Sequence, residues 1–353
     1  MQKLENKIFF PALAGIRIIA AWIIFLHHIS NEVKIGWLNS FFREFYVGVG
    51  IFFTISGFLT YILYFNKYEE GQFSFKKFLQ NRLARLIPLY WIMLIIAAVW
   101  QWESLKSFTL SILLLQSYFE EFKFSYVAQA WTIPVQLMFY VSVPLFFLWV
   151  KKYKYWFVFW PLLVLLIGVG LMFSFSSISF YGFLADLDFL MIYTFFGRVF
   201  EFTIGALVAQ IWCNRNSDKI LKFKPTITGG VSYLFLIFIL SSFQNPEIFY
   251  GINHPVGLIL NHILLPFSIG LFLIGLCSER TYFSKFLSMP PMIILGNAAY
   301  AFYLIHVGYF YEFIYFQISS NLLIRFINLN ILAVLIYKFL ELPIQRALLS
   351  FRK

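Results

Sequence analysis

Charged residues are scarce in this chain: Asp, Glu, Lys and Arg make up 12% of its 353 residues, while 61% are hydrophobic. Soluble domains carry roughly a quarter charged residues, and a soluble fold cannot bury this much apolar surface. The scarcity excludes a soluble enzyme and a disordered tail. Cysteine is scarce too. The two present, Cys213 and Cys277, exclude a disulfide scaffold and are expected to be reduced thiols with no role in metal binding.

Alternation of apolar and polar residues is also missing, which excludes a transmembrane β-barrel. Present instead are apolar runs near the ~20 residues that a helix needs to cross a bilayer. We therefore predict an all-α, polytopic transmembrane helix bundle, with residues 1–353 forming a single domain and no separate soluble domain. The ten predicted spans are Ile8–Ile29, Phe45–Phe65, Leu86–Trp102, Trp131–Val150, Tyr155–Phe173, Tyr193–Trp212, Thr226–Phe243, Val256–Cys277, Pro291–Tyr311 and Leu322–Leu340. The apolar segments 104–118 and 178–190 are short and are predicted to be interfacial or re-entrant.

Basic residues outnumber acidic ones, 27 to 16, giving a net charge of +11. Most of the basic residues lie near the two termini and in alternate loops, at 67–85, 151–154, 215–224 and 280–285. The positive-inside rule then predicts that both termini are cytoplasmic, as an even number of spans requires. No basic cluster is interleaved with aromatic residues, so we expect no nucleic-acid partner. The first apolar run is too long for a cleaved signal and is expected to remain as a span.

Ionisable residues within a span are costly and usually face the bundle interior or water. The first span carries Arg17 and His28, eleven residues apart. On a helix these two share one face, about 16 Å apart along the axis, and His27 is rotated from it by about 100°. We interpret His28 as a general base and Arg17 as an anchor for a charged donor or as a brace. In the alternative, Arg17 snorkels to the cytoplasmic interface and His28 caps the outer end.

Two further arginine motifs stand at span ends. Arg82 and Arg85 are i, i+3 neighbours before the third span and would suit the phosphates of a nucleotide-bearing donor, or would serve as ordinary positive-inside anchors. Arg198 and Glu201, also i, i+3 neighbours, either neutralise each other or leave Glu201 to orient an imidazole.

The small residues of Ser56–Phe58 lie within the second span and permit either close helix packing or close approach to a ligand. His306 lies toward the outer end of the ninth span, where it is a substrate contact or an interfacial histidine. Glu341 is expected to end the tenth span near Lys338 or Arg346.

Taken in order, these segments resemble the acyltransferase-3 family of integral-membrane acyltransferases over nearly the whole chain. The first-span pair Arg17 and His28 is similar to an arginine and histidine that the family has there. Five further segments carry the resemblance: GVGIFFTISGFL with Ser56, Gly57 and Phe58; RLARLIPLYW with Arg82, Arg85, Pro88 and Tyr90; AWTIPVQLMFYVSVPLF with Trp131 and Gln136; GRVFEFTIG with Arg198 and Glu201; and AYAFYLIH with His306.

The resemblance implies transfer of an acyl group, usually acetyl from cytoplasmic acetyl-CoA, to a sugar hydroxyl of a surface polysaccharide or glycolipid. It implies a multi-pass protein of a bacterial cell membrane, surrounded by lipid, with acyl-CoA as co-substrate and no bound cofactor or metal. The implied catalytic residues are His28, Arg17 and Glu201, with His28 as base or acyl carrier. The implied donor-binding residues are Arg82, Arg85 and Tyr90. The implied substrate or packing residues are Ser56, Gly57, Phe58, Trp131, Gln136, Arg198 and His306.

The sequence departs from the family pattern at two positions, with Gln136 where glutamate is usual and Gly50 where aspartate is frequent. An amide cannot act as a base or counter-ion. If position 136 normally orients the catalytic imidazole, this role would move to Glu201, or the specificity for the acyl group or the acceptor would differ. We still predict an active enzyme, with acetyl or a longer acyl group such as succinyl as the cargo. The alternatives are a glycolipid or polysaccharide transporter, which would normally carry acidic residues deep in its spans, and a non-catalytic scaffold.

Overall fold

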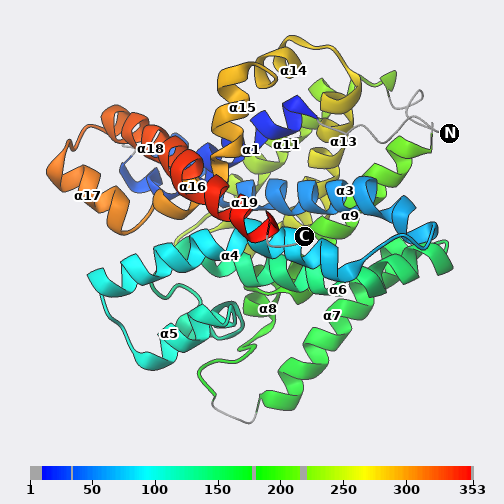
Figure 1. Cartoon of the computed structure of the whole chain (residues 1–353), viewed down its shortest axis with the longest axis horizontal. Helices are drawn as coiled ribbons and strands as arrows, with labels where there is room; N and C mark the ends of the chain where they lie inside the picture. Colours follow the sequence, from blue (N-terminus) through cyan, green and yellow to red (C-terminus); the bar gives the residue numbers. More distant parts are fainter. Residues whose placement is uncertain (1–9, 33–34, 177–179, 215–220, 351–353) are drawn as a thin grey trace. The chain divides into compact units, whose positions relative to one another are not determined.

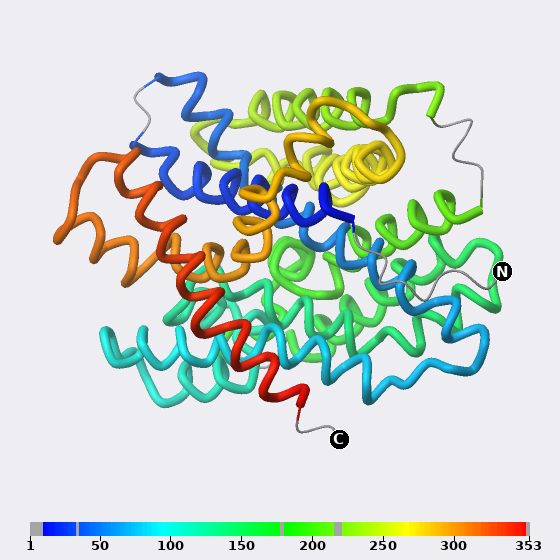
Figure 2. Tube along the Cα trace, turned by 45° about the horizontal axis from the view of Figure 1, so that its top comes forward, coloured from blue at the N-terminus to red at the C-terminus, as the bar shows by residue number. Residues whose placement is uncertain are grey.

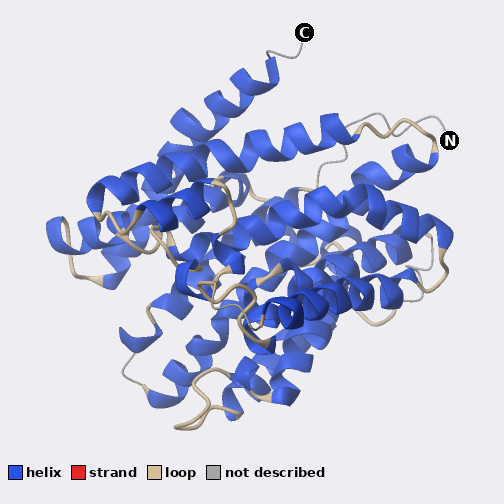
Figure 3. Ribbon diagram, turned by 90° about the horizontal axis from the view of Figure 1, so that it is seen from below, coloured by secondary structure: helices blue, strands red, loops and turns tan. Residues whose placement is uncertain are grey.

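The computed structural model describes residues 10–32, 35–176, 180–214 and 221–350. Within these ranges the backbone is helical, joined by turns and loops (Figure 3). Their strand-like pairing is confined to an isolated antiparallel bridge between Phe119 and Phe183. The all-α prediction is confirmed for this part of the chain.

Nine helical segments of the described chain are long and apolar enough to cross a membrane. They correspond to nine of the ten predicted spans, because a long apolar run is stable in lipid only as a helix that satisfies its own backbone groups. Their helices are α1 (Pro11–His28), α2 (Gly36–Arg43) with α3 (Gly48–Glu69), α4 (Phe75–Trp100), α6 (Thr132–Lys152), α7 (Trp156–Phe175), α9 (Phe195–Cys213), α11 (Pro225–Ser242), α12 (Pro255–Ile259) with α13 (Leu265–Ser278), and α18 (Leu322–Ile336) with α19 (Leu342–Ser350).

The predicted ninth span is not one helix. Residues 290–317 form three short helices, α15 (Pro290–Asn297), α16 (Ala299–Ile305) and α17 (Tyr309–Gln317). The break before α17 lies at Gly308, whose φ of 78° and ψ of −147° are strained for other residues and end any helix. A broken helix is tolerated at membrane depth only where protein covers it, and all seven residues of α16 but Tyr300 are buried.

The chain folds as two compact units, each made of two separate segments. Unit 1 comprises residues 1–73 and 200–297, and unit 2 comprises residues 74–199 and 298–353, so the division falls inside α9 and between α15 and α16. Within unit 1, α1 packs against α3, α15 and the short helix α14 (Tyr282–Leu287), while α11 packs along α13 (Figure 1).

In unit 2, α4 packs against α6, α16 and α19, and α16 packs against α18. Figure 2 shows α18 and α19 as one long helical segment at the C-terminal end of the chain. A π-helical turn, η8 (Tyr337–Glu341), joins these two helices. In unit 1 a second π-helical turn, η7 (Leu260–Leu264), joins α12 to α13. Such turns hold one extra residue and are frequent at functional sites.

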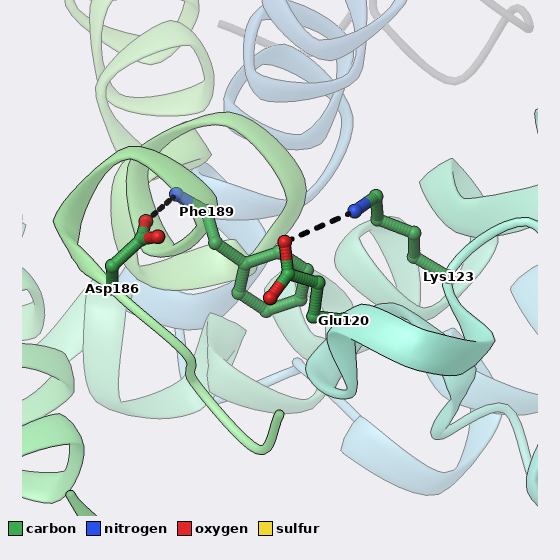
Figure 4. A network of polar contacts seen from close by, with 4 residues as sticks. All are labelled: Glu120, Lys123, Asp186 and Phe189. Carbon is green, nitrogen blue, oxygen red and sulfur yellow. Dashed lines mark hydrogen bonds and ion pairs between the residues drawn. The ribbon is translucent and has the colours of Figure 1, made fainter. Parts of the chain in front are cut away.

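The two apolar segments that were predicted to be too short to span form α5 (Leu105–Ile112) and α8 (Leu187–Tyr193), although residues 177–179 lie outside the described part. The carboxylate of Asp186 caps α8 by accepting from the Phe189 N–H at 2.8 Å. Nearby, Lys123 Nζ lies 3.6 Å from Glu120 and over the Phe189 ring (Figure 4). These polar contacts tie the 120s loop to the start of α8.

Candidate functional site

α1 carries both of the predicted first-span residues on one continuous helix. Its Ile18, Ala20 and Ala21 side chains are fully buried, whereas Arg17 is half-buried and His28, the last residue of the helix, is exposed. An exposed imidazole at a helix end is accessible at the protein surface, and histidine is the side chain whose unperturbed pKa lies closest to neutral pH.

His27, next to it, is held by the protein backbone. Its Nδ1 lies 2.7 Å from the carbonyl oxygen of Arg43. Because a carbonyl only accepts, Nδ1 carries the hydrogen and donates it. The His27 ring also lies 4.9 Å from the His28 ring, 5.8 Å from Tyr46 and 5.7 Å from Tyr250, between centroids. Burial raises the pKa of the Tyr250 phenol, which therefore stays neutral.

The predicted motif Ser56–Phe58 lies on α3 where that helix crosses α9. A Cβ added to Gly57 would lie 2.0 Å from the carbonyl oxygen of Phe202, and one added to Gly205 would lie 2.1 Å from that of Thr54. The two glycines therefore let the backbones touch directly, as small residues do in membrane helix pairs. Close packing accounts for the glycine of this motif.

Phe58 follows Gly57 and is fully buried, with its ring 6.3 Å from that of Trp212 on α9. Ser56 is half-buried.

Glu201, on α9, faces a histidine that was not among the predicted site residues. The Glu201 carboxylate is fully buried, and its Oε1 lies 3.8 Å from Nδ1 of His262, which is 2% exposed. His262 and its buried neighbour Asn261 belong to the π-helical turn η7. Oε1 is also 3.9 Å from the place that a Cβ of Gly50 would occupy. The imidazole beside Glu201 is therefore that of His262.

The predicted donor arginines lie on α4, in unit 2. The Arg82 guanidinium lies over the rings of Phe78 and Tyr140, 5.4 and 5.2 Å from their centroids. Arg85 interacts electrostatically with Glu341, which is 5% exposed and belongs to the π-helical turn η8. These cation–π and charge contacts orient both arginines on the same helix.

Tyr90, the third predicted donor residue, is 1% exposed. Its hydroxyl donates to the carbonyl of Ser111 at 2.9 Å and accepts from Nε2 of Gln116 at 3.1 Å. The side chain therefore joins α4 to α5 and the turn that follows it.

His306 follows α16 directly and is buried within the protein. It is 1% exposed, its Nδ1 lies 2.7 Å from the Tyr303 carbonyl, and its ring stacks on that of Phe302. The Tyr303 hydroxyl donates to the Gln129 carbonyl at 2.7 Å and lies 3.0 Å from Oγ1 of Thr132. The start of α6 is therefore hydrogen-bonded to α16.

Trp131 and Arg198 form a second cluster in unit 2. The Arg198 guanidinium lies over the Trp131 ring at 5.5 Å, and its Nε donates to the Ile192 carbonyl at 2.7 Å. The Trp131 ring meets Tyr193 edge to face at 5.2 Å. Gln136 is buried one turn further along α6.

The predicted site residues thus fall into two sets, which are described separately. Unit 1 holds Arg17, His28, Ser56, Gly57, Phe58 and Glu201; unit 2 holds Arg82, Arg85, Tyr90, Trp131, Gln136, Arg198 and His306.

Comparison with known proteins identifies the family to which these residues belong. A family described as an acyltransferase domain, Acyl_transf_3, matches residues 10–341, which takes in both units. The chain belongs to this acyltransferase family. No solved structure matches it.

Two curated proteins of Staphylococcus aureus are similar to this acyltransferase-family chain. SACOL0978 of strain COL, provisionally named an O-acetyltransferase, is 26% identical, with 98% of this chain and 58% of that protein covered. The O-acetyltransferase OatA of strain NCTC 8325 / PS 47 is 25% identical, with 98% and 59% covered. The chain therefore spans less than two thirds of the length of these relatives.

His262 is a buried polar residue of this acyltransferase-family chain that the sequence analysis did not select. Asn261 and His262 interrupt an apolar run within the predicted span Val256–Cys277, which is the same signal that selected Arg17 and His28. The pairing of His262 with Glu201 joins positions 61 residues apart, and only the fold brings them together.

Proposed function

We propose that this chain is a membrane O-acetyltransferase that moves acetyl from acetyl-CoA to a sugar hydroxyl of a surface glycan or glycolipid. The observation that carries the proposal is the exposed imidazole of His28 at the end of α1, with Arg17 on the same helix, in a chain that matches the acyltransferase family over residues 10–341. The names of the two relatives support the acetyl group as the cargo.

In the proposed reaction, His28 accepts the proton of the acceptor hydroxyl. The hydroxyl oxygen then attacks the thioester carbonyl of acetyl-CoA, a C–O bond forms, and the C–S bond breaks. The departing CoA thiolate takes up a proton and leaves as the thiol. A neutral imidazole has the basicity for this step at physiological pH.

Arg82 and Arg85 are proposed to bind the donor. Both are cations on α4, and two guanidiniums one turn apart can hold phosphate oxygens through charge-assisted hydrogen bonds. The donor would approach from the cytoplasm, the side on which the distribution of Lys and Arg predicts both termini to lie. That orientation requires an even number of crossings, and the broken segment α15–α17 would supply the tenth.

Gln136 occupies the position where the family usually has glutamate, and we propose that Glu201 with His262 supplies the acidic group instead. The two side chains of this pair are buried inside unit 1, with the Glu201 carboxylate 3.8 Å from Nδ1 of His262.

The proposal is tested by incubating reconstituted protein with radiolabelled acetyl-CoA and a glycan acceptor. His28→Ala should abolish transfer, while Asn31→Ala, a neighbouring change at an exposed side chain, should leave it unchanged. Full transfer by His28→Ala would remove His28 from the mechanism.

Donor binding has its own test. Arg82→Ala and Arg85→Ala should raise the KM for acetyl-CoA more than they lower kcat. Lys76→Ala removes an exposed cation from the first turn of the same helix and serves as the control. If the Lys76 variant and the two arginine variants raised the KM for acetyl-CoA equally, the arginines would contribute only general surface charge.

A further inference from the structure

A carboxylate that the predicted site does not include lies near the end of α1. Glu44 is fully buried at the start of the turn η2 (Glu44–Val47), which follows α2. Its Oε1 accepts from Nε2 of Gln244 at 2.5 Å and from the Gly251 N–H at 2.8 Å, and its Oε2 accepts from the Tyr46 hydroxyl at 3.0 Å. A buried carboxylate needs such donors, because burial removes its hydration.

Two of these donors come from one loop. Gln244 and Gly251 belong to the connection between α11 and α12, so Glu44 holds both sides of this loop. Gln244 also donates to the Ser40 carbonyl of α2 at 2.8 Å. Inside the loop, the Asn245 side chain accepts from the Glu247 and Ile248 N–H groups at 2.9 and 2.8 Å. The connection is therefore an ordered loop, held by its own hydrogen bonds and attached to η2 through the Glu44 carboxylate.

The loop brings Tyr250 to the first-span histidines. Tyr250 directly precedes Gly251, and its ring lies 5.8 Å from Tyr46 and 5.7 Å from His27. Tyr46 lies 5.8 Å from His27 as well, so the three rings form a triangle. The exposed His28 ring is 4.9 Å from the His27 corner of this triangle. Tyr46 and Tyr250 are each partly exposed.

This arrangement suits a sugar. A hexose presents C–H faces that stack on aromatic rings and hydroxyls that hydrogen-bond phenols, and tyrosine offers both kinds of contact. A sugar ring stacked on the side chain of Tyr46 or Tyr250 would place the sugar hydroxyls near His28, the proposed base.

We propose that Tyr46 and Tyr250 form the subsite for the acceptor sugar, and that Glu44 is the positioning residue that assembles it by fixing the 243–254 loop. The inference deepens the proposed function and rests on it for the role of His28. Glu44 itself is not assigned a contact with the sugar.

The test measures sugar binding separately from transfer. Binding of a panel of 4-nitrophenyl hexosides to the reconstituted full chain is followed by saturation-transfer NMR without donor. Tyr250→Leu and Glu44→Ala should weaken binding tenfold or more, and Tyr46→Phe should weaken it less. Glu247→Ala, which removes an exposed carboxylate from the same loop, should leave binding unchanged.

Hydrogen exchange of residues 243–254 supplies the readout for Glu44. Exchange should rise in Glu44→Ala, stay near wild type in Glu44→Gln, which can still accept at Oε1, and stay unchanged in Tyr250→Leu. Equal sugar binding by Tyr250→Leu and wild type, or no sugar binding by wild type, would overturn the subsite. Unchanged exchange in Glu44→Ala would overturn the role of Glu44. Sugar binding without acetyl transfer would instead refute the proposed function alone.

Discussion

Replacing Gly57 by alanine should force α3 and α9 apart. The added Cβ would lie 2.0 Å from the Phe202 carbonyl oxygen, whereas real Cβ atoms essentially never approach a heavy atom within 3.0 Å. The obstacle is backbone, which cannot rotate away as a side chain can, so the helices must separate locally by about 1 Å. Overpacking of this kind costs about 1–3 kcal/mol, and thermal unfolding in detergent should show a midpoint several degrees below wild type.

Gly205→Ala meets the Thr54 carbonyl at 2.1 Å from the opposite side of the same crossing and should cost a similar amount. Because one separation of the helices relieves both clashes, the double variant should lose less than the two single losses combined. This non-additivity is the sharper part of the prediction, since two unrelated packing defects would simply add.

Gly170→Ala is the matched control. Nothing lies within 4 Å of a Cβ at this position in α7, so the substitution should be neutral or gain about 0.5–1 kcal/mol from helix propensity. If Gly57→Ala unfolds at the same temperature as Gly170→Ala, α3 and α9 do not touch at this point and the reasoning is refuted.

Three further predictions concern polar and backbone features. His262→Ala removes the imidazole beside the buried Glu201 carboxylate and should cost about 3–5 kcal/mol of stability; Glu201→Gln, which leaves no charge to bury, should cost clearly less in the same melting assay. Tyr90→Phe removes the hydroxyl that bonds Ser111 and should cost about 1–3 kcal/mol without changing the KM for acetyl-CoA, whereas a raised KM would support the predicted role of Tyr90 in donor binding. Gly308→Ala, at a φ of 78°, should cost about 1–3 kcal/mol, and an unchanged midpoint would contradict the observed break.

Most of the helices could be predicted from the sequence because lipid imposes a simple rule: an apolar run of sufficient length must be a helix. The same rule failed for Pro291–Tyr311. Apolarity reports that a segment is covered by lipid or by protein, and it cannot distinguish the two. The interruption depends on the backbone angles of Gly308 and on the burial of α16 by its neighbours, and neither quantity is encoded in a hydropathy pattern.

The candidate site was predictable where a residue was conspicuous by itself. Arg17 and His28 stand out because they are ionisable within an apolar run, and α1 carries both. Glu44 did not stand out, because it lies near a predicted span end where acids are common. Its significance comes from burial and from donors about 200 residues away in the chain, Gln244 and Gly251. Long-range hydrogen bonds of this kind follow from the tertiary fold and have no local signature.

The direction in which the His262 side chain points depends on the number of residues in the π-helical turn η7, as well as on the residue type at position 262. On its N-terminal side, a Cβ at Gly257 would lie 1.8 Å from the Gly251 oxygen, and on its C-terminal side one at Gly275 would lie 2.3 Å from the Thr226 nitrogen. Both halves of the helix are thus locked in rotation by their own contacts. Loss of one residue from the turn would rotate one half against the other by about 100°. An insertion or deletion in this turn would therefore rotate His262 away from Glu201. Relatives that have the glutamate but differ in length at this turn need not have a histidine beside it.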